Sequence, residues 1–361
     1  RARFDEIQIP AIAVGYYDTV IAWDHELHRA WLISQGWPEQ DADRRRHRAT
    51  ERIVDFKRWI AKSSPRQPSS RSGAVVHSSD LAPQFSVNVH ESLTSNFAAN
   101  EYRATVQRAI DYIRAGDIFQ VNLSQRLLAP AQDDSVSLYL RLRGRNPATF
   151  AAFFDLGPSQ IVSASPERFL SLRGATVEAR PIKGTRQRIQ HPEADLFAGD
   201  DLLQSEKDRA ENVMIVDLLR NDLSRVCKAH SVHVTELCRL EVYEYVQHLV
   251  SVVRGELSDG KGPLDLLRAA FPGGSITGAP KVRAMEIIAE LEPTTRGAYC
   301  GSLGYIGFDG TMDMSILIRT ITASGGWWQL PVGGGIVAQS DPQQEYEETW
   351  HKATGLIKAL V

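Results

Sequence analysis

The sequence predicts an α+β (mixed α/β) fold, with a mixed sheet and helices packed outside it. Some apolar residues fall in short runs typical of strands, and others recur at helical spacing. The two kinds of segment do not alternate strictly along the chain, which argues against a doubly wound parallel sheet. The 361 residues, 43% of them hydrophobic, allow one large domain or two smaller ones with a sizeable core. No internal repeat is visible.

Residues 1–62 are predicted to be the remnant of an N-terminal subdomain, with short strands followed by a helix at 38–62. Residues 63–95 form a Ser/Pro-rich linker by composition, because their first part is too polar and proline-rich to bury a core. The chain opens without a start signal, so we expect natural N-terminal residues to precede it. The predicted strands are Ala11–Tyr16, Val20–Asp24 and Ala30–Ser34, and the predicted buried helical positions are Ala42, Ile53, Phe56, Trp59 and Ile60.

Residues 96–361 are predicted to form the main domain. Its first helix, Glu101–Gly116, has apolar residues at helical spacing and a glycine at its C-terminal stop. Gly273–Gly278 is a glycine-rich turn, and Pro280 suits the first position of a helix that runs to Leu291. The other predicted helices are Lys207–Val226, Leu264–Ala270 and Gln344–Leu360, and the predicted strands are Ile118–Leu127, Phe150–Asp155, Gln160–Ala164, Phe169–Leu172, Ala298–Phe308, Met312–Thr322, Trp327–Pro331 and Gly335–Ala338.

The composition excludes several classes of protein. A net charge of −3 and an isoelectric point near 6.4 give no electrostatic reason to expect nucleic acid or a membrane surface as a partner. No apolar run approaches the roughly 18 residues that span a bilayer. Cys227, Cys238 and Cys300 lack Cys-x-x-Cys spacing, which disfavours a disulfide framework and a zinc site. We therefore expect a reduced, cytoplasmic protein.

Lys183 lies in the segment Arg180–Arg186, directly after the strand-like run Thr176–Ala179. Pro181 shortly before it and Gly184 directly after it leave the backbone little freedom. A lysine presented in this way can act as a nucleophile when desolvation or a cationic neighbour lowers the pKa of its amine. Taken alone, a lysine beside a glycine is more often a surface residue in a turn. The interpretation therefore depends on the rest of the chain.

Two predicted helices each carry a pair of acids three residues apart, Asp208 with Glu211 and Glu345 with Glu348. This spacing places both carboxylates of a pair on one helix face. Acids near a helix N-terminus usually only complement the helix dipole. Two such pairs facing one another would instead form a site rich in carboxylate oxygen, which suits Mg²⁺. Lys352, one turn beyond Glu348, would place a positive charge nearby for an anionic substrate.

Two glycine-rich segments allow a ligand to approach the backbone closely. Gly273–Lys281 looks like a phosphate loop, but Ala279 follows Gly278 where a Walker A motif needs a lysine. Glycines that lead into a helix N-terminus still present N–H groups to an anion, and a carboxylate fits as well as a phosphate. Gly333–Gly335 offers a second close approach. Either segment could equally be a tight turn that needs positive φ.

Four further residues are candidates for binding or protonating an anionic substrate. Glu167 lies just before a strand, and a buried glutamate with a raised pKa can act as a general acid. The alternative for this residue is a structural ion pair with Arg168. Arg319 and His248 lie within apolar strand-like runs, and a buried Arg319 needs an anionic partner. Tyr305 could offer its hydroxyl group to a carboxylate, although a core tyrosine is the commoner case.

Together and in this order, the motifs resemble the chorismate-utilising enzyme family, which contains the large subunits of anthranilate, aminodeoxychorismate and isochorismate synthases. The resemblance covers about residues 100–360 without a gap. So many long motifs in one order make chance similarity negligible. The motifs are Gly116–Arg126, Ser165–Phe169, Pro181–Thr185, Lys207–Asn212, Arg220–Leu223, Ala270–Lys281, Ile318–Thr320, Gly333–Val337 and Glu345–Thr349.

The resemblance implies an anthranilate synthase component I-like fold, with two packed β-sheets surrounded by helices. Complete members of the family carry further N-terminal residues, which help to complete this sandwich and hold any tryptophan-binding pocket. The cofactor implied is Mg²⁺, with Glu211 and Glu348 as direct ligands and Asp208 and Glu345 as outer or alternate ligands. The substrate-binding residues implied are Arg319, Tyr305, Lys352, His248, Thr277, Gly278, Gly334 and Gly335.

The resemblance also implies a reaction. Glu167 would protonate the departing 4-hydroxyl group of chorismate while Lys183 attacks C2 of the ring. Ammonia would then add at C4 and expel Lys183, which gives 4-amino-4-deoxychorismate. A separate glutamine amidotransferase subunit would supply the ammonia, because the sequence contains no glutaminase motif.

Two positions separate the chemistries within the family. Anthranilate and isochorismate synthases generally carry a small residue where this chain has Lys183, so Pro181–Thr185 resembles the aminodeoxychorismate synthase branch, which serves para-aminobenzoate and folate biosynthesis. The water-using members carry a general-base lysine at the position of Gln120, and a glutamine cannot deprotonate water. The alternatives are anthranilate synthase component I and a truncated, non-catalytic scaffold that binds only a partner subunit.

Overall fold

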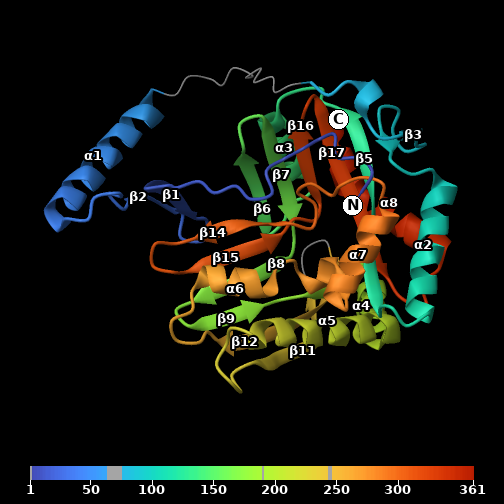
Figure 1. Ribbon diagram of the computed structural model, residues 1–361. Coiled ribbons are helices and arrows are strands. Elements are labelled where there is room, and N and C mark those ends of the chain that lie inside the picture. Colours follow the sequence, from blue (N-terminus) through green and yellow to red (C-terminus); the bar gives the residue numbers. More distant parts are fainter. Residues whose placement is uncertain (1, 63–74, 189–190, 243–245) are drawn as a thin grey trace. The chain divides into compact units, whose positions relative to one another are not determined.

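The computed structural model describes residues 2–62, 75–188, 191–242 and 246–361 (Figure 1). The chain divides into two compact units, one of residues Pro10–Ser70 and one of Arg1–Ile9 with Arg71–Val361. The bounds of these units differ from those of the predicted domains at the N-terminus and within the predicted linker. Residues 1–9 join the large unit, where Phe4 forms a bridge with Thr294. Residues 75–95 belong to the large unit as well, and residues 63–74 of the predicted linker lie outside the described residues.

The small unit consists of a hairpin and a helix. Strand β1 (Thr19–Asp24) pairs antiparallel with β2 (Arg29–Ser34), and helix α1 (Ala42–Ala61) follows. The strand predicted at Ala11–Tyr16 is wrong, because that exposed segment has no pairing partner among the described residues. Helix α1 buries none of its residues, since the hairpin of this unit is too small to cover it. The buried positions predicted at Ala42, Ile53, Phe56, Trp59 and Ile60 are therefore wrong as well.

The large unit contains two large sheets, in which every assigned strand pair is antiparallel (Figure 1). The eight-stranded sheet has the order β3 (Phe85–Ser86), β4 (Thr94–Ser95), β5 (Gln120–Pro130), β17 (Trp327–Ile336), β16 (Thr320–Ser324), β7 (Ser159–Ser165) and β6 (Phe150–Asp155), and β13 (Gly278–Ala279) pairs with β5. The seven-stranded sheet has the order β10 (Ile182–Gln187), β12 (Val246–Glu256), β9 (Thr176–Ala179), β8 (Arg168–Arg173), β15 (Met312–Ile316) and β14 (Ser302–Ile306), and β11 (His233–Val242) pairs with β12.

Two neighbouring segments carry the chain from one sheet to the other, between β7 and β8 and between β15 and β16. The single strand predicted at Met312–Thr322 is therefore wrong. Arg319 interrupts it with a φ of 50°, in the left-handed region that side chains other than glycine rarely adopt. The hydroxyl group of Ser165 donates a hydrogen bond to the carbonyl oxygen of Ile316 at 2.5 Å, so the two segments lie against each other.

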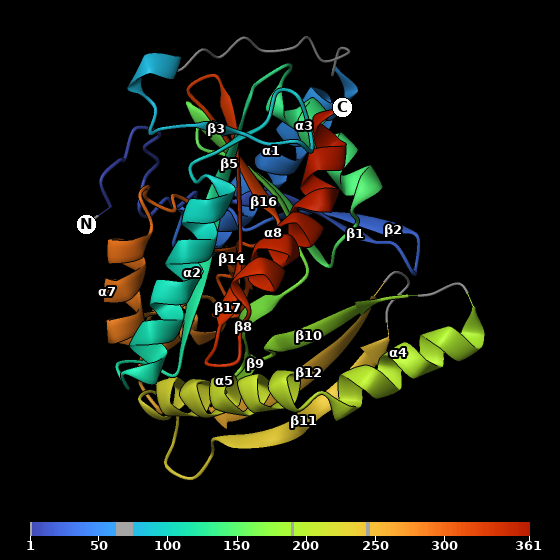
Figure 2. The same cartoon turned by 90° about the vertical axis from the view of Figure 1, so that its right-hand side faces the viewer.

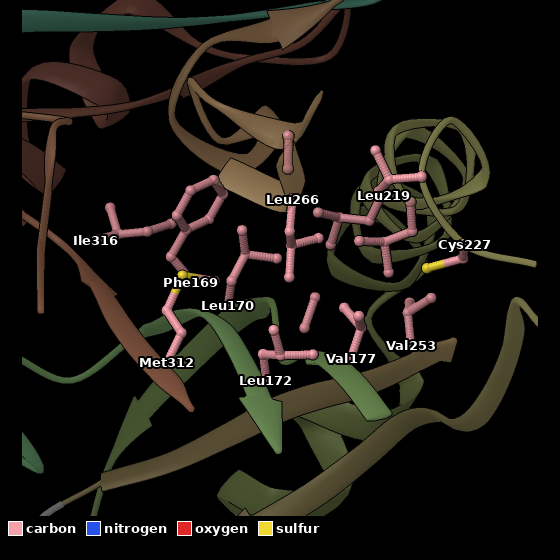
Figure 3. Close-up of a cluster of buried hydrophobic side chains, with 14 of the residues drawn as sticks. Phe169, Leu170, Leu172, Val177, Leu219, Cys227, Val253, Leu266, Met312 and Ile316 are labelled. Carbon is pink, nitrogen blue, oxygen red and sulfur yellow. The ribbon is translucent and has the colours of Figure 1, made fainter. Parts of the chain in front are cut away.

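Helices cover the seven-stranded sheet on the side where its largest apolar cluster lies. Helices α5 (Glu206–Ser224) and α6 (Pro263–Ala270) contribute Leu219 and Leu266 to this cluster, and the strands contribute Phe169, Val177 and Val253 (Figure 3). Burial of this apolar surface fixes α5 along the sheet. Helix α4 (Pro192–Gln204), which we did not predict, precedes α5 along the same sheet (Figure 2).

Four helices pack on the eight-stranded sheet: α2 (Ala99–Arg114), α3 (Ser135–Arg145), α7 (Lys281–Leu291) and α8 (Pro342–Ile357). Helices α2 and α8 lie side by side (Figure 2), and the rings of Tyr102 and Tyr346 approach to 5.8 Å between them. Helix α3 was not predicted. The described residues of the large unit also form three short 3₁₀ helices, η1 (Ser78–Asp80), η2 (Gly274–Ile276) and η3 (Lys358–Leu360). Among the helices built from described residues, none combines the length and the apolar character needed to cross a bilayer.

Candidate active site

Lys183 lies on β10, opposite Leu249 of β12. The pairing is irregular between Lys183 and Thr185, where Gly184 has a φ of 73°. A side chain at position 184 would lie 2.7 Å from Leu202 of α4 and 3.0 Å from Asp208 of α5. Glycine is therefore required both by the backbone conformation and by the close approach of two helices.

The Lys183 side chain points into the protein and is only 11% exposed. Its Nζ atom lies 2.6 Å from Oε1 of Glu211 and 3.3 Å from the carbonyl oxygen of Ser275 in η2. The same Glu211 oxygen accepts a hydrogen bond from Gln120 at 2.9 Å. The other amide atom of that side chain, Oε1 of Gln120, is buried and has no partner among the described residues. Lys183 is thus a buried, ion-paired lysine, unlike an ordinary surface residue in a turn.

Glu167 lies in the first crossing between the sheets and is 5% exposed. Its Oε1 atom accepts a hydrogen bond from the hydroxyl group of Ser275 at 3.1 Å. Burial raises the pKa of Glu167 to about 7, although the positive charge of Lys183 and the hydrogen bond from Ser275 oppose the rise. A carboxyl group with this pKa can hold a proton near neutral pH and release it during a reaction. Ser275 contacts both Glu167 and Lys183.

The alternative of an ion pair between Glu167 and Arg168 does not describe the structure. Arg168 donates to Asp313 through Nε and Nη2, at 3.0 Å each, and lies 3.3 Å from Glu178. Glu167 and Arg168 therefore bind different partners, as successive residues of an extended segment do when their side chains point to opposite faces.

Arg319 lies at the crossing between β15 and β16, and its positive charge acts on His248 of β12. Burial lowers the pKa of the Arg319 guanidinium, and attraction to Glu167 partly compensates. Among the described residues, this guanidinium has no hydrogen-bond partner, which leaves its donors available to an anion. Burial, followed by the charge of Arg319, lowers the pKa of His248 to about 4, and its Nδ1 atom lies 2.9 Å from the hydroxyl group of Thr185. His248 is thus a neutral imidazole at pH 7.

Two successive glycines each lie beside carboxylates of the predicted acid pairs. A side chain at Gly335 would lie 2.7 Å from Oε1 of Glu211. A side chain at Gly334 would lie 3.4 Å from Glu345 and 3.6 Å from Glu348. Glycine thus leaves room for a carboxylate of α5 at one position and for two carboxylates of α8 at the other, and Lys207 of α5 donates to Glu345 of α8 at 3.2 Å. The fourth acid, Asp208, is turned toward Gly184 and lies 3.8 Å from Arg186.

Each of the three acids at Gly334 and Gly335 lies beside a lysine. Glu211 pairs with Lys183, and Glu345 accepts hydrogen bonds from Lys207 at 3.2 Å and from Ser340 at 2.6 Å. Glu348 lies 2.6 Å from Lys352, which also donates to the carbonyl oxygen of Gly333 at 3.0 Å.

The acid–lysine pairs differ in exposure. Glu211 is 12% and Glu345 4% exposed, whereas Glu348 is 47% exposed. Partial burial of Glu348 favours its neutral form, but the charges of Lys352 and Lys207 outweigh this effect and lower its pKa. Of the three acids, Glu348 is therefore the most open to solvent.

The carboxylates beside Gly334 and Gly335 are suited to a hard cation such as Mg²⁺. Such a cation takes one or two carboxylates and completes its shell with water and substrate oxygen. Within the described part of the chain, no three side chains of the His, Cys, Asp and Glu types converge as a complete metal cluster. Glu211 and Glu348 each lie 2.6 Å from a lysine amine, so a metal ion would have to compete with these lysines for the carboxylates.

The remaining predicted residues lie in different surroundings. Gly278 has a φ of 140°, and a side chain there would lie 2.1 Å from the carbonyl oxygen of Gln120, so the close approach is to the protein's own backbone. Thr277 is buried, and its hydroxyl group donates to the carbonyl oxygen of Gly273 at 2.9 Å. Tyr305 of β14 is 63% exposed and makes no side-chain hydrogen bond with any described residue. The structure does not make Tyr305 part of the buried acid–lysine cluster.

Sequence reasoning missed two residues of this site. Ser275 lies inside the glycine-rich segment that we singled out, and its hydroxyl group was the available signal. Lys207 directly precedes the first acid pair, but its partner Glu345 is 138 residues away along the chain. No local pattern indicates such a contact.

Comparisons with known proteins agree with this geometry. The family described as chorismate binding enzyme matches residues 2–358. The chain is 41% identical to anthranilate synthase component 1 of Thermus thermophilus over 356 residues, which cover 99% of this chain and 72% of that protein. It is 42% identical to aminodeoxychorismate synthase component 1 of Escherichia coli over 355 residues, which cover 98% of this chain and 72% of that protein.

A solved structure confirms the predicted fold class. The crystal structure of anthranilate synthase component I from Streptococcus pneumoniae matches with a TM-score of 0.80 and 32% sequence identity, over 99% of this chain and 76% of that one. The resemblance inferred from the motifs is therefore confirmed at the level of the family. The chain belongs to the family of chorismate-binding enzymes and is a chorismate-utilising enzyme.

Proposed function

We propose that this chain is component I of an aminodeoxychorismate synthase, which converts chorismate and ammonia to 4-amino-4-deoxychorismate. Relatives of the two kinds are equally similar, at 41% and 42% identity, so similarity alone does not discriminate between them. The observation that supports the proposal is the position of Lys183, whose side chain is 11% exposed and whose amine lies 2.6 Å from Glu211. A small residue at this position would leave no nucleophile there.

In the proposed first step, the neutral amine of Lys183 forms a bond to C2 of the chorismate ring. Both ring double bonds shift, from C1=C2 and C5=C6 to C1=C6 and C4=C5, and the bond from C4 to its hydroxyl oxygen breaks. Glu167 gives its proton to that oxygen, so that water leaves. The attack requires the neutral amine, because a protonated amine has no lone pair with which to form the bond.

In the second step, ammonia forms a bond to C4, both ring double bonds shift back, and the bond between C2 and the lysine nitrogen breaks. The leaving amine of Lys183 is restored for the next cycle, and a proton released by the incoming ammonia returns Glu167 to its acid form. Two displacements through a covalent adduct thus give net replacement of the hydroxyl group by an amino group. The overall products are 4-amino-4-deoxychorismate and water.

Substrate carboxylates would be held by positive groups around these two residues. The Arg319 guanidinium has free donors close to Glu167, and Lys352 lies at the solvent side of the acid cluster. Glu211 and Glu348 would hold Mg²⁺, and Asp208 and Glu345 would serve as outer or alternate ligands. When bound, the ion neutralises a ring carboxylate whose negative charge would otherwise oppose the attack.

The name "component 1" carried by both kinds of relative fits an enzyme made of more than one chain. We propose that a separate glutamine amidotransferase subunit supplies the ammonia and that free ammonium can replace it in an assay.

The assay that tests the proposal combines the chain with chorismate, Mg²⁺ and ammonium and identifies the product. We expect 4-amino-4-deoxychorismate. Formation of anthranilate and pyruvate would contradict the proposal and would favour the second candidate, anthranilate synthase component I. That candidate draws its support from the Thermus thermophilus relative, which matches 99% of this chain.

A further inference from the structure

An ion pair between Glu292 and Arg296 lies beside η2. Glu292, at the C-terminal end of α7, is 4% exposed, and Arg296 is 15% exposed. Arg296 donates to both carboxylate oxygens, at 2.6 Å from Nη2 and 2.8 Å from Nε. Oε1 of Glu292 also accepts from the backbone nitrogen and the hydroxyl group of Ser124, at 2.8 and 2.9 Å. The carboxylate therefore holds the guanidinium in one orientation.

The other donors of Arg296 bind two backbone carbonyl oxygens. Nη1 lies 3.1 Å from the oxygen of Ile276, the last residue of η2, and Nη2 lies 2.6 Å from the oxygen of Asn122 in β5. The backbone nitrogen of Asn122 in turn donates to the oxygen of Thr277 at 2.8 Å. Arg296 thus links η2 to β5 of the eight-stranded sheet, and the backbone bond between Asn122 and Thr277 lies close by.

The segment held in this way contains Ser275, the residue directly before Ile276. Its hydroxyl group contacts Glu167 and its carbonyl oxygen contacts Lys183. Both contacts depend on the orientation of one short 3₁₀ turn, because a rotation of the Ser275 backbone would move its carbonyl oxygen and its side chain together. A displacement of about 1 Å between reacting groups is enough to lower a rate by a factor of about 100.

We propose that Arg296 and Glu292 form a positioning pair for the active site, which holds η2 so that Ser275 contacts the proposed general acid and the proposed nucleophile at the same time. The inference rests on the proposed function for the roles of Glu167 and Lys183. It adds that the alignment of these two groups is set by an ion pair that touches neither of them.

A merely structural role of the pair predicts a different outcome. Removal of a buried, bidentate guanidinium would then lower the stability of the whole unit, and the folded fraction would keep its normal turnover. A positioning role predicts a loss of kcat in protein that is still folded, with little change in KM for chorismate, because Arg319 and Lys352, which we propose to hold the substrate carboxylates, make no hydrogen bond to η2 among the described residues.

The experiment uses Arg296→Lys in the full chain and measures chorismate consumption with Mg²⁺ and ammonium. Lysine keeps the charge but cannot bind Glu292 and two carbonyl oxygens as a planar fork. We expect kcat to fall about 10- to 100-fold and KM for chorismate to change less than about 3-fold. Arg283→Lys is the matched control, because Arg283 also contacts two carboxylates, Asp117 and Glu286, but has no bond to η2. Its kcat should equal that of the wild type.

A double-mutant cycle with Ser275→Ala tests whether the pair acts through Ser275. If it does, the double variant should be no more than about 2-fold slower than the slower single variant, since both changes remove the same alignment. Losses that multiply would overturn the proposal, as would an Arg296→Lys kcat equal to that of Arg283→Lys. If Arg296→Lys fails to fold, Glu292→Gln replaces it, and a normal kcat in that variant would overturn the proposal.

The readout separates this inference from the proposed function. Chorismate consumption is counted whichever amino product forms, so the cycle remains valid if the product is anthranilate. A product other than 4-amino-4-deoxychorismate would overturn the proposed function alone. Independent action of Arg296 and Ser275 would overturn the positioning pair alone.

Discussion

The backbone nitrogen of Ile316 donates a hydrogen bond to the carbonyl oxygen of Glu167 at 3.1 Å, and this bond joins two of the segments in which the chain changes sheets. The backbone nitrogen of Ala164 likewise donates to the oxygen of Arg319 at 3.0 Å. A charged side chain inside either sheet would be buried among apolar neighbours at a large cost in free energy. At the junction, Glu167 and Arg319 compensate each other's charge, which explains why both lie there.

We expect Glu167→Gln to change how stability depends on pH. The unfolded chain titrates this group near pH 4.5, and the folded protein titrates it at about 7, so the folded state binds the proton more tightly. The contribution of Glu167 to stability is therefore fully present below about pH 4.5 and is lost as the pH rises through about 7. The loss is on the order of 3 kcal/mol.

Urea unfolding of the wild type and of Glu167→Gln at several pH values measures this contribution. Glutamine cannot ionise, so the free energy of unfolding of the variant should rise relative to that of the wild type between pH 5 and pH 8. The turnover of the variant should be lost, because glutamine has no acidic proton to donate. Parallel curves for the two proteins would show that Glu167 does not carry a raised pKa.

Lys183→Ala should abolish both turnover with ammonium and the covalent adduct. When ammonia is withheld, the second displacement cannot occur, so the wild type should accumulate a species heavier by the mass of chorismate less one water. Mass spectrometry of the intact chain checks this. Lys261→Ala, which changes a surface lysine 3.9 Å from Asp265, should still form the adduct. A Lys183→Ala variant that consumes chorismate at the wild-type rate would show that another group is the nucleophile.

Gly184→Ala should destabilise the protein more than Gly116→Ala does, by about 1–3 kcal/mol. Both glycines have positive φ, 73° and 85°, so both substitutions carry a similar backbone cost. A side chain at Gly116 would meet no atom within 4 Å, whereas one at Gly184 would collide with Leu202 and crowd Asp208. Urea unfolding compares the two variants. Equal losses would mean that the site tolerates this displacement of α4 and α5.

Much of the site was predictable because its residue types lie in long, ordered motifs. The sequence identified Lys183, Glu167 and the two acid pairs, but not that each acid at the two glycines lies beside a lysine. Lys352 lies one helical turn from Glu348, but the other two pairings join residues 28 and 138 positions apart in the chain, and only tertiary packing decides them. The spacing of three also did not show that Asp208 and Glu211 would contact different partners, although they share a helix face.

The errors in the fold have a common physical cause. Hydrophobic periodicity reports burial, and it cannot show which surface covers a residue. The apolar run Met312–Thr322 is buried along most of its length but crosses from one sheet to the other at Arg319, so the pattern continues through the break. Helix α1 shows the opposite case, with apolar side chains such as Trp59 that remain 67% exposed.

Glu348→Gln should weaken the affinity for Mg²⁺ about 10- to 100-fold, since a neutral amide replaces a charged ligand and even indirect partners of a metal have effects of this size. Glu347→Gln is the matched control: it lies on the same helix and is exposed, but its carboxylate accepts a hydrogen bond from Gln343 at 2.7 Å and belongs to no acid–lysine pair of the site. Calorimetric titration with Mg²⁺ alone measures the affinity without relying on turnover. Unchanged affinity in Glu348→Gln would place the metal away from α8.

Because Lys352 lies 2.6 Å from Glu348, the ion must compete with this lysine for the carboxylate, so Lys352→Met should tighten the affinity for Mg²⁺.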